Sequence, residues 1–260
     1  MGTLPNILSK RPHPAEHDLA GVIVDANGTS FANGDDIIGF IPVCKSRSTR
    51  PYFLLQRSTA LQSSSRQGAL AQYVTLPKDN VTPKPAKISW EESAALPLTA
   101  LTAVQALRLG GYDPARALSP NPIPATQESI FINGGSTSVG IYAIQLAKAL
   151  SLRVTASASA RNETLVRDLG ADTFLDYTAR PLAEQLSAGP PEVRFGMILD
   201  AAGSVDTGLY VRSGAYVKKG GLYVTTGPWP DKGGWLGFAG RWTGALLRPS
   251  FLGGTPTTWK

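Results

Sequence analysis

The stretch from Ser129 to Leu150 constrains the fold more than any other part of the sequence. It reads SIFINGGSTSVGIYAIQLAKAL, which predicts a buried strand, a turn of small residues and a helix that begins at the turn. The same strand-then-helix order repeats downstream. Because strands that alternate with helices of this length form right-handed βαβ units, the chain from residue 129 onward predicts a doubly wound parallel sheet of the α/β class.

The predicted elements follow one another along the whole chain. The first ninety residues are expected to be mainly β, and the segment from Ser89 to Leu109 is expected to be helical, with Ser89 and Glu92 spaced as a capping box. The expected strands are 18–26, 37–43, 68–76, 129–133, 153–156, 173–176, 195–200 and 221–225, and the expected later helices are 139–150, 161–169, 181–187 and 207–217. We therefore expect three parts: a β lobe at 1–95, a Rossmann domain at 96–230 and an irregular C-terminal segment at 231–260.

Composition narrows the classes of protein that fit. The chain has 260 residues, of which 42% are hydrophobic and 17% charged, so it can bury a core. Its formal charge of +6 is scattered without a stripe, which argues against nucleic acid and fits a phosphorylated small molecule. Cys44 is the only cysteine, so there is no intrachain disulfide and no zinc site of several thiolates. No apolar run predicts a membrane span or a secretory signal, so we expect a cytoplasmic protein without a membrane partner.

The turn after the strand at 129–133 resembles the dinucleotide fingerprint G-x-G-x-x-G. Gly135 and Gly140 occupy its first and third glycine positions, and Thr137 occupies the second. The hydroxyl of Thr137, with those of Ser136 and Ser138, is expected to donate to a phosphate beside the free amides of the helix. We therefore interpret the turn as a pyrophosphate site.

The end of the next strand is where dinucleotide-binding proteins distinguish NAD from NADP. Twenty residues after Thr137 the sequence reads SASARN, and the first carboxylate is Glu163. Hydroxyl, amide and guanidinium donors suit a 2′-phosphate better than a free ribose, which predicts NADPH over NADH. These donors are Ser157, Ser159, Arg161 and Asn162. The alternative is that Arg161 and Asn162 only begin a helix with solvated side chains.

Seven segments in order resemble the medium-chain dehydrogenase/reductase superfamily, and within it the zinc-independent quinone oxidoreductase and enoyl reductase branch. The turn GGST and the late LLRPSFLGGTP look most like fungal members. The matching segments are DLAGVIVDANG, NGDDIIGF, GALAQYVTLP, EESAALPLTALTAVQAL, GGSTSVGIYAIQLAKAL, LVRDLGADTFLDY and GGLYVTTGP.

The resemblance implies a GroES-like β lobe and a Rossmann lobe with NADPH in the cleft between them. It assigns Ser136, Thr137, Ser138, Val139, Ser159, Ala160, Arg161, Asn162 and Tyr177 to the cofactor, and the fingerprint and its spacing add Gly135, Gly140 and Ser157. Those that it assigns to the substrate are Leu96, Pro97, Leu98, Thr99, Ala100, Leu101, Thr102 and Ala103. Tyr177 as a simple cap of the sheet and Thr102 as an ordinary helix residue stay open as alternatives.

The sequence departs from the family at both ends. The family's first β strands are missing, and the chain stops before its last strands, so we expect a member truncated at both ends with an exposed sheet edge. Glu16-His17-Asp18 falls where zinc-dependent members carry a ligand motif, but the other ligands are absent apart from Cys44. We expect no metal, with His17 an ordinary loop residue.

The resemblance implies an NADPH-dependent reductase that transfers hydride to an activated C=C bond or a quinone, such as an enone or an enoyl thioester, in secondary metabolism among other settings. The sequence names no catalytic residue or proton donor. Two alternatives stay open: a non-catalytic NADPH-binding or scaffold protein, and a cofactor-independent enzyme that uses the inherited pocket. The expected partners are a small-molecule substrate and either a second copy of the chain or an enzyme such as a polyketide synthase.

Overall fold

The computed structural model describes residues 16–41, 68–120, 128–203, 208–227 and 258–259. The chain divides into two units, residues 1–101 and 102–260, and each unit has its own β-sheet. The described residues thus contain both a small antiparallel sheet and a larger parallel one.

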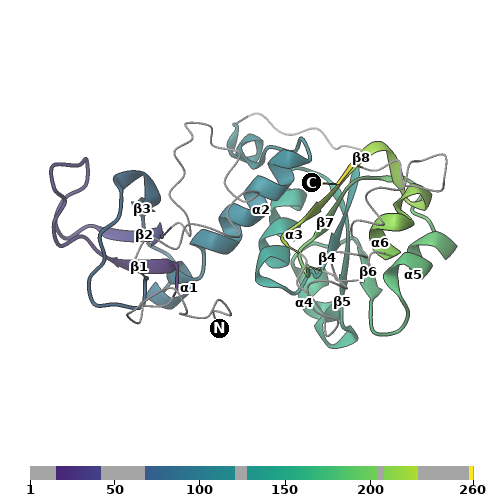
Figure 1. Ribbon diagram of the computed structural model, residues 1–260, viewed down its shortest axis with the longest axis horizontal. Helices are drawn as coiled ribbons and strands as arrows, with labels where there is room; N and C mark the ends of the chain where they lie inside the picture. Colours follow the sequence, from purple (N-terminus) through teal and green to yellow (C-terminus); the bar gives the residue numbers. More distant parts are fainter. Residues whose placement is uncertain (1–15, 42–67, 121–127, 204–207, 228–257, 260) are drawn as a thin grey trace, which may run out of the picture. The chain divides into compact units, whose positions relative to one another are not determined.

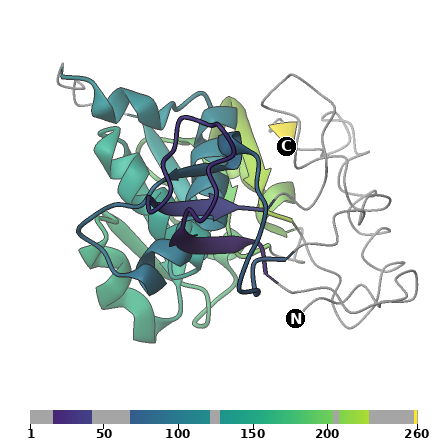
Figure 2. The same ribbon diagram turned by 90° about the vertical axis from the view of Figure 1, so that its left-hand side faces the viewer.

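The first unit is built on three antiparallel strands. They are β1 (Asp18–Val22), β2 (Asp36–Phe40) and β3 (Val81–Pro83), with β2 in the centre. The strands β1 and β2, in purple, lie side by side in Figure 2. Within the connection between β1 and β2, Asn27 and Gly28 both adopt the positive φ that a tight turn requires.

The third strand of this unit differs from the prediction. The segment at 68–76 forms no strand, and the chain pairs with β2 only at β3, after a short 3-10 turn η2 (Lys78–Asn80). Pro83 ends β3 opposite Ile37. Because β3 is an edge strand, the amide that proline lacks is not needed for a further ladder.

The helical segment begins as the sequence predicted. The Ser89 hydroxyl accepts from the Glu92 N–H at 3.1 Å and the Glu92 carboxylate accepts from the Ser89 N–H at 2.8 Å, so the capping box opens α1 (Trp90–Ala94). Pro97 ends this helix and begins α2 (Pro97–Leu109). The Leu98 N–H in the first turn of α2 donates to the Asp18 carboxylate at 2.8 Å, which ties α2 to β1.

The second unit confirms the doubly wound α/β fold. Its six strands run parallel in the order β6–β5–β4–β7–β8–β9. Figure 1 shows the helices packed around this sheet. The strands are β4 (Ser129–Asn133), β5 (Arg153–Ala158), β6 (Thr173–Asp176), β7 (Phe195–Asp200), β8 (Val217–Thr225) and β9 (Thr258–Trp259).

The helices of this unit are short. None in the described part of the chain is long and apolar enough to cross a membrane. They are η3 (Pro114–Leu118), α3 (Ser138–Ala149), η4 (Ala160–Asn162), α4 (Glu163–Asp168), α5 (Leu182–Ala188), α6 (Gly208–Val211) and η5 (Ser213–Ala215).

Two stretches of the second unit differ from the prediction. The expected helix at 207–217 is only α6 and η5, because Gly208 and Gly214 weaken it and the chain enters β8 already at Val217. In the segment that was expected to be irregular, Thr258 and Trp259 pair with Leu222 and Tyr223 of β8. The outer edge of β8, which was expected to be exposed, is therefore covered over two residues.

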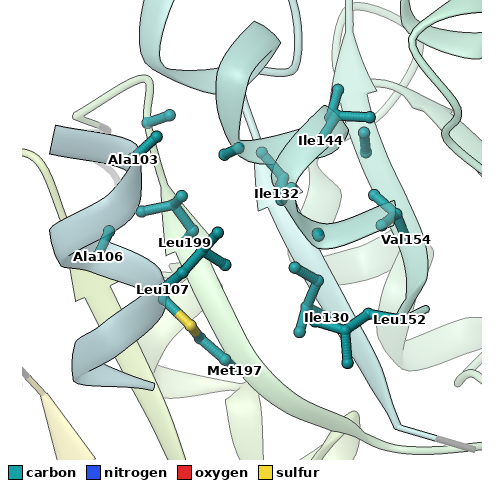
Figure 3. Packing of buried hydrophobic residues seen from close by; sticks show 14 of the residues in the cluster. Ala103, Ala106, Leu107, Ile130, Ile132, Ile144, Leu152, Val154, Met197 and Leu199 are labelled. Atoms are coloured by element: carbon teal, nitrogen blue, oxygen red, sulfur yellow. The ribbon is translucent and has the colours of Figure 1, made fainter. Parts of the chain in front are cut away.

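Alternate residues of each central strand face opposite sides of the sheet. On one side Ile130 and Ile132 of β4 pack with residues of α2, α3 and α4. On the other side Phe131 stacks on Phe195 of β7, with ring centroids 5.6 Å apart, and packs with residues of α5 and α6. Figure 3 shows the first side, where Leu107 of α2 meets Met197 and Leu199 of β7. The sheet is therefore buried on both faces.

Leu107 and Leu109 make a matched pair for testing this packing. Leu107 is fully buried and Leu109 is 40% exposed on the same helix. We expect Leu107→Ala to lower the free energy of unfolding by about 2–5 kcal/mol, since it leaves a cavity, and Leu109→Ala to lower it by less than about 1 kcal/mol. Urea unfolding followed by circular dichroism measures both. Equal losses would contradict the described position of α2 on the sheet.

Candidate functional site

The candidate site lies at the carboxyl edge of the parallel sheet. From β4 the chain winds outward through β5 and β6, then returns to the other side of β4 with β7. The strand order thus reverses between β4 and β7, and such a switch point is where open α/β sheets bind ligands. The turns after β4 and β7 meet there, because a Cβ added to Gly134 would lie 3.0 Å from Ala202.

The turn after β4 is built for close backbone approach. Gly134 has a φ of +83°, so the tight turn falls one residue earlier than the predicted fingerprint position, Gly135. A Cβ at Gly140 would lie 2.1 Å from the Gly134 carbonyl oxygen, and a Cβ at Gly135 would crowd Ile144 and Ala156 at 3.1 and 3.2 Å. These three glycines let α3 start directly against the end of β4.

Thr137 is the N-cap of α3. Its hydroxyl accepts from the Gly140 N–H at 3.1 Å and donates to the Gly134 carbonyl at 2.8 Å. This differs from the expectation that the Thr137 hydroxyl donates to a phosphate, because its proton is already used within the turn. Threonine replaces the middle glycine of the fingerprint because its side chain locks the turn.

Donors for an anion remain at the start of α3. Ser138 and Val139 occupy the first two helical positions, where an N–H has no acceptor within its own helix. The side chain of Ser138 is exposed, and that of Ser136 is partly so. The dipole of this 12-residue helix adds positive potential at the same point.

The second predicted turn lies beside the first. The Asn162 side chain donates from Nδ2 to the Ser136 hydroxyl at 3.1 Å and to the Ser159 hydroxyl at 3.3 Å. Residues 26 positions apart in the sequence, Ser136 and Asn162, are thereby joined into one polar cluster. Ala160 and Arg161 are exposed on η4 next to it.

Ser157 and Tyr177 occupy different positions in this region. Ser157 is fully buried, and its hydroxyl donates to the Asn133 amide oxygen at 2.7 Å and accepts from the Gly134 N–H at 3.2 Å. It therefore supports the turn from within, which differs from the expectation that it faces a phosphate. Tyr177 follows β6, is 54% exposed, and bonds through its N–H to the Ala158 carbonyl at 3.3 Å.

A buried polar network beneath the turn was missed by the sequence reasoning. Asn133 at the end of β4 donates to the Asp200 carboxylate at the end of β7 at 2.8 Å, and the Tyr223 hydroxyl of β8 donates to the same carboxylate at 3.1 Å. With Ser157 of β5, the network joins four neighbouring strands at their carboxyl ends. Polar residues that end predicted buried strands were the signal that could have found it.

The residues assigned to the substrate lie on one helix start but differ in exposure. Leu98 and Leu101 are 38% and 48% exposed, whereas Pro97 is buried. Ala103 is fully buried in the core of the second unit, so its side chain offers no surface to a substrate. The Thr99 hydroxyl donates to the Ala95 carbonyl at 3.0 Å, as hydroxyls inside helices commonly do. The others, Leu96, Ala100 and Thr102, are partly exposed.

A strongly displaced pKa lies at the other end of the sheet. Burial raises the pKa of Tyr112 well above its usual value, and a 2.6 Å hydrogen bond to Glu128, just before β4, adds to the effect. Lys218 completes this group 3.5 Å from Glu128. Because the group is at the amino end of β4, it stands apart from the glycine turn.

The possible metal motif at Glu16-His17-Asp18 lies in the first unit. His17 Nδ1 is 3.0 Å from the Ile41 carbonyl oxygen, and Asp18 is held by Leu98. Within the described ranges no three His, Cys, Asp or Glu residues group as metal ligands do. Cys44 lies outside the described residues.

The fold and the glycine turn define a Rossmann-type α/β protein, and comparisons with known proteins agree. No family model matches the chain. Human mitochondrial NAD(P)H oxidoreductase RTN4IP1 is 36% identical over 194 residues, 73% of this chain and 41% of that protein. The trans-enoyl reductase tndF of Aspergillus flavipes is 37% identical over 123 residues, 47% of this chain and 34% of that protein.

A solved structure of an NAD-dependent alcohol dehydrogenase has a TM-score of 0.65 at 25% identity, covering 89% of this chain and 65% of the other. The chain belongs to the medium-chain dehydrogenase/reductase superfamily, as its motifs predicted. It spans about a third to a half of the length of the curated relatives that it matches.

Thr137 tests the role of the cap. We expect Thr137→Ala to lower the free energy of unfolding by about 1–2 kcal/mol, because the Gly140 N–H and the Gly134 carbonyl both lose a partner. Thr137→Ser keeps the hydroxyl and is expected to cost less than about 0.5 kcal/mol. Urea unfolding compares the two, and an equal loss in both variants would rule out the cap as the reason for threonine.

Gly140 tests the close approach of helix and strand. We expect Gly140→Ala to cost about 1–3 kcal/mol or more, since its Cβ would overlap the Gly134 carbonyl. Gly189→Ala is the control, because its Cβ would meet only Gln185 at an ordinary 3.7 Å. Thermal unfolding of the two variants decides, and a Gly140→Ala protein as stable as the control would contradict the geometry of the turn.

Proposed function

We propose that the chain binds a nicotinamide dinucleotide, NADPH in preference to NADH, at the carboxyl edge of its parallel sheet. We further propose that the protein is a reductase that acts on an activated C=C bond or a quinone. The observation that carries the proposal is the cluster of Ser136, Ser159 and Asn162, which joins the α3 N-terminus to the turn after β5. A dinucleotide needs both of these places at once, one for its pyrophosphate and one for its adenosine end.

The glycine turn fits the pyrophosphate. Gly134, Gly135 and Gly140 let α3 begin directly against the end of β4, so its first N–H groups lie at the carboxyl edge of the sheet. Ser138 and Val139 would bind the phosphates through their N–H groups, and the Ser136 and Ser138 hydroxyls would add side-chain donors. The role of Thr137 is to hold these donors in place through its two hydrogen bonds.

The turn after β5 fits a 2′-phosphate. The Ser159 hydroxyl offers a neutral donor that the Asn162 side chain holds in place, and Arg161 is exposed without an ion pair to any described carboxylate. Arg161 would supply the charge that distinguishes a phosphate from a ribose hydroxyl. Tyr177 is exposed on the neighbouring turn and would cover the adenosine end.

The reaction class is drawn from the relatives. The names of the relatives reported above describe an NAD(P)H oxidoreductase and a trans-enoyl reductase. Bound NADPH would supply the hydride, and the residues of this chain would bind and orient it. The exposed apolar side chains of Leu98 and Leu101 suit an apolar substrate such as an enone or an acyl chain.

Fluorescence titration with NADPH and with NADH tests the proposal. We expect Arg161→Ala to weaken NADPH binding about tenfold and NADH binding less than threefold, because only NADPH carries the 2′-phosphate. Arg153→Ala is the control, since Arg153 is exposed at the opposite end of β5. Equal losses for both nucleotides would contradict the phosphate assignment.

Binding alone does not test the reaction class. NADPH oxidation measured with simple enones and quinones tests it directly. Turnover with either class supports the reductase. Tight NADPH binding without turnover on any of them would favour a non-catalytic nucleotide-binding protein.

A further inference from the structure

Asp176 brings a carboxylate to the proposed 2′-phosphate turn from a different strand. It is the last residue of β6 and lies in register with Ala158, near the end of β5. The next residue, Tyr177, donates its N–H to the Ala158 carbonyl. The ends of β5 and β6 are therefore adjacent, although 18 positions separate Ala158 from Asp176 in the sequence.

The carboxylate of Asp176 is held firmly in this position. It accepts from the Thr178 hydroxyl at 2.7 Å and from the Thr178 N–H at 2.8 Å. These hydrogen bonds, with that of the Thr178 hydroxyl foremost, keep the pKa of Asp176 below its usual value. Asp176 is therefore a full negative charge at neutral pH.

Asp176 and Arg161 form no ion pair with each other or with any other described residue. Glu163 is paired with Arg167 on α4 at 2.8 Å. Arg161 has no ion pair among the described residues. The side chains of Ser159 and Asn162 are neutral. A fixed anion thus lies at the end of β6, beside the strand whose turn would bind a dianionic phosphate.

We propose that Asp176 is a selectivity-determining residue that limits the preference for NADPH over NADH. The inference rests on the proposed function. Its charge, fixed by Thr178 at the strand end next to β5, repels a 2′-phosphate. A ribose with a free 2′-hydroxyl carries no charge, and it can donate to a carboxylate. Strand β6 therefore supplies the acidic group that the turn after β5 lacks.

Titration of Asp176→Asn with NADPH and NADH tests this assignment. The substitution removes the charge and keeps an oxygen that can accept from Thr178. We expect NADPH to bind about fivefold more tightly and NADH to bind equally or more weakly, so that the ratio of the two dissociation constants shifts at least about fivefold. The shift is expected to shrink as the salt concentration rises from about 0.05 to about 0.5 M, since salt screens exposed charges.

Asp168→Asn is the matched control. Asp168 is exposed at the end of α4, and the same charge is removed there without touching η4. We expect its NADPH to NADH ratio to remain within about twofold of the wild type. Asp176→Ser provides a second neutral variant if Asp176→Asn does not fold, and it is expected to shift the ratio in the same direction.

The outcomes separate the inference from the proposed function. A ratio that is unchanged in both Asp176 variants, or a shift that is insensitive to salt, would overturn the selectivity role and leave Asp176 only as the residue that holds the turn at Thr178. If the wild-type chain binds neither nucleotide, the proposed function fails and the inference fails with it. A salt-sensitive shift toward NADPH in the Asp176 variants alone supports the assignment.

Discussion

The contact between the backbone of Gly140 and the carbonyl of Gly134 determines how closely α3 can approach the end of β4. The rest of the second unit follows from that distance. Ala143 and Ala147 of α3 and Ala156 of β5 are fully buried, which a longer helix-to-sheet distance would leave loosely packed. The same contact places the first N–H groups of α3 at the carboxyl edge of the sheet, so packing and anion binding depend on one backbone approach.

The carboxyl edge of the parallel sheet combines buried, hydrogen-bonded side chains with exposed ones. Beneath the turn, Asn133 and Asp200 are buried and hydrogen-bonded to each other, which fixes the ends of β4 and β7. Above it, Arg161 and Tyr177 are exposed and free to meet a ligand. A site of this kind can keep its position in the fold while its exposed residues change selectivity.

The sequence predicted the parallel sheet well because each central strand is a run of apolar residues followed by a turn signal. Strands β4, β6 and β7 begin and end at the predicted residues. Strand β3 was missed, because three residues with a proline carry no periodic pattern. The roles of Thr137 and Ser157 were also not apparent, since a hydroxyl looks the same in the sequence whether its proton goes to a ligand or to a buried carbonyl. Asp176 was overlooked because only the sheet brings its strand end beside η4.

The Asn133-Gly134 pair also governs how the protein ages chemically. An asparagine followed by glycine is the sequence that cyclises most readily, when the glycine nitrogen attacks the side-chain amide, and such asparagines are thermolabile. Here the amide of Asn133 is bonded to Asp200 and Ser157, and the Gly134 N–H is bonded to the Ser157 hydroxyl, so neither reacting group is free to move. Asn33-Gly34 in the first unit is restrained in the same way, because the Asn33 amide oxygen accepts from the Ala26 N–H and the Gly34 N–H donates to the Ile23 carbonyl. Asn27-Gly28 is exposed, and no bond of this kind holds the Asn27 side chain or the Gly28 N–H among the described residues. We therefore expect deamidation of the folded protein first at Asn27, whereas deamidation at Asn133 requires the turn after β4 to open and then places a second carboxylate beside Asp200.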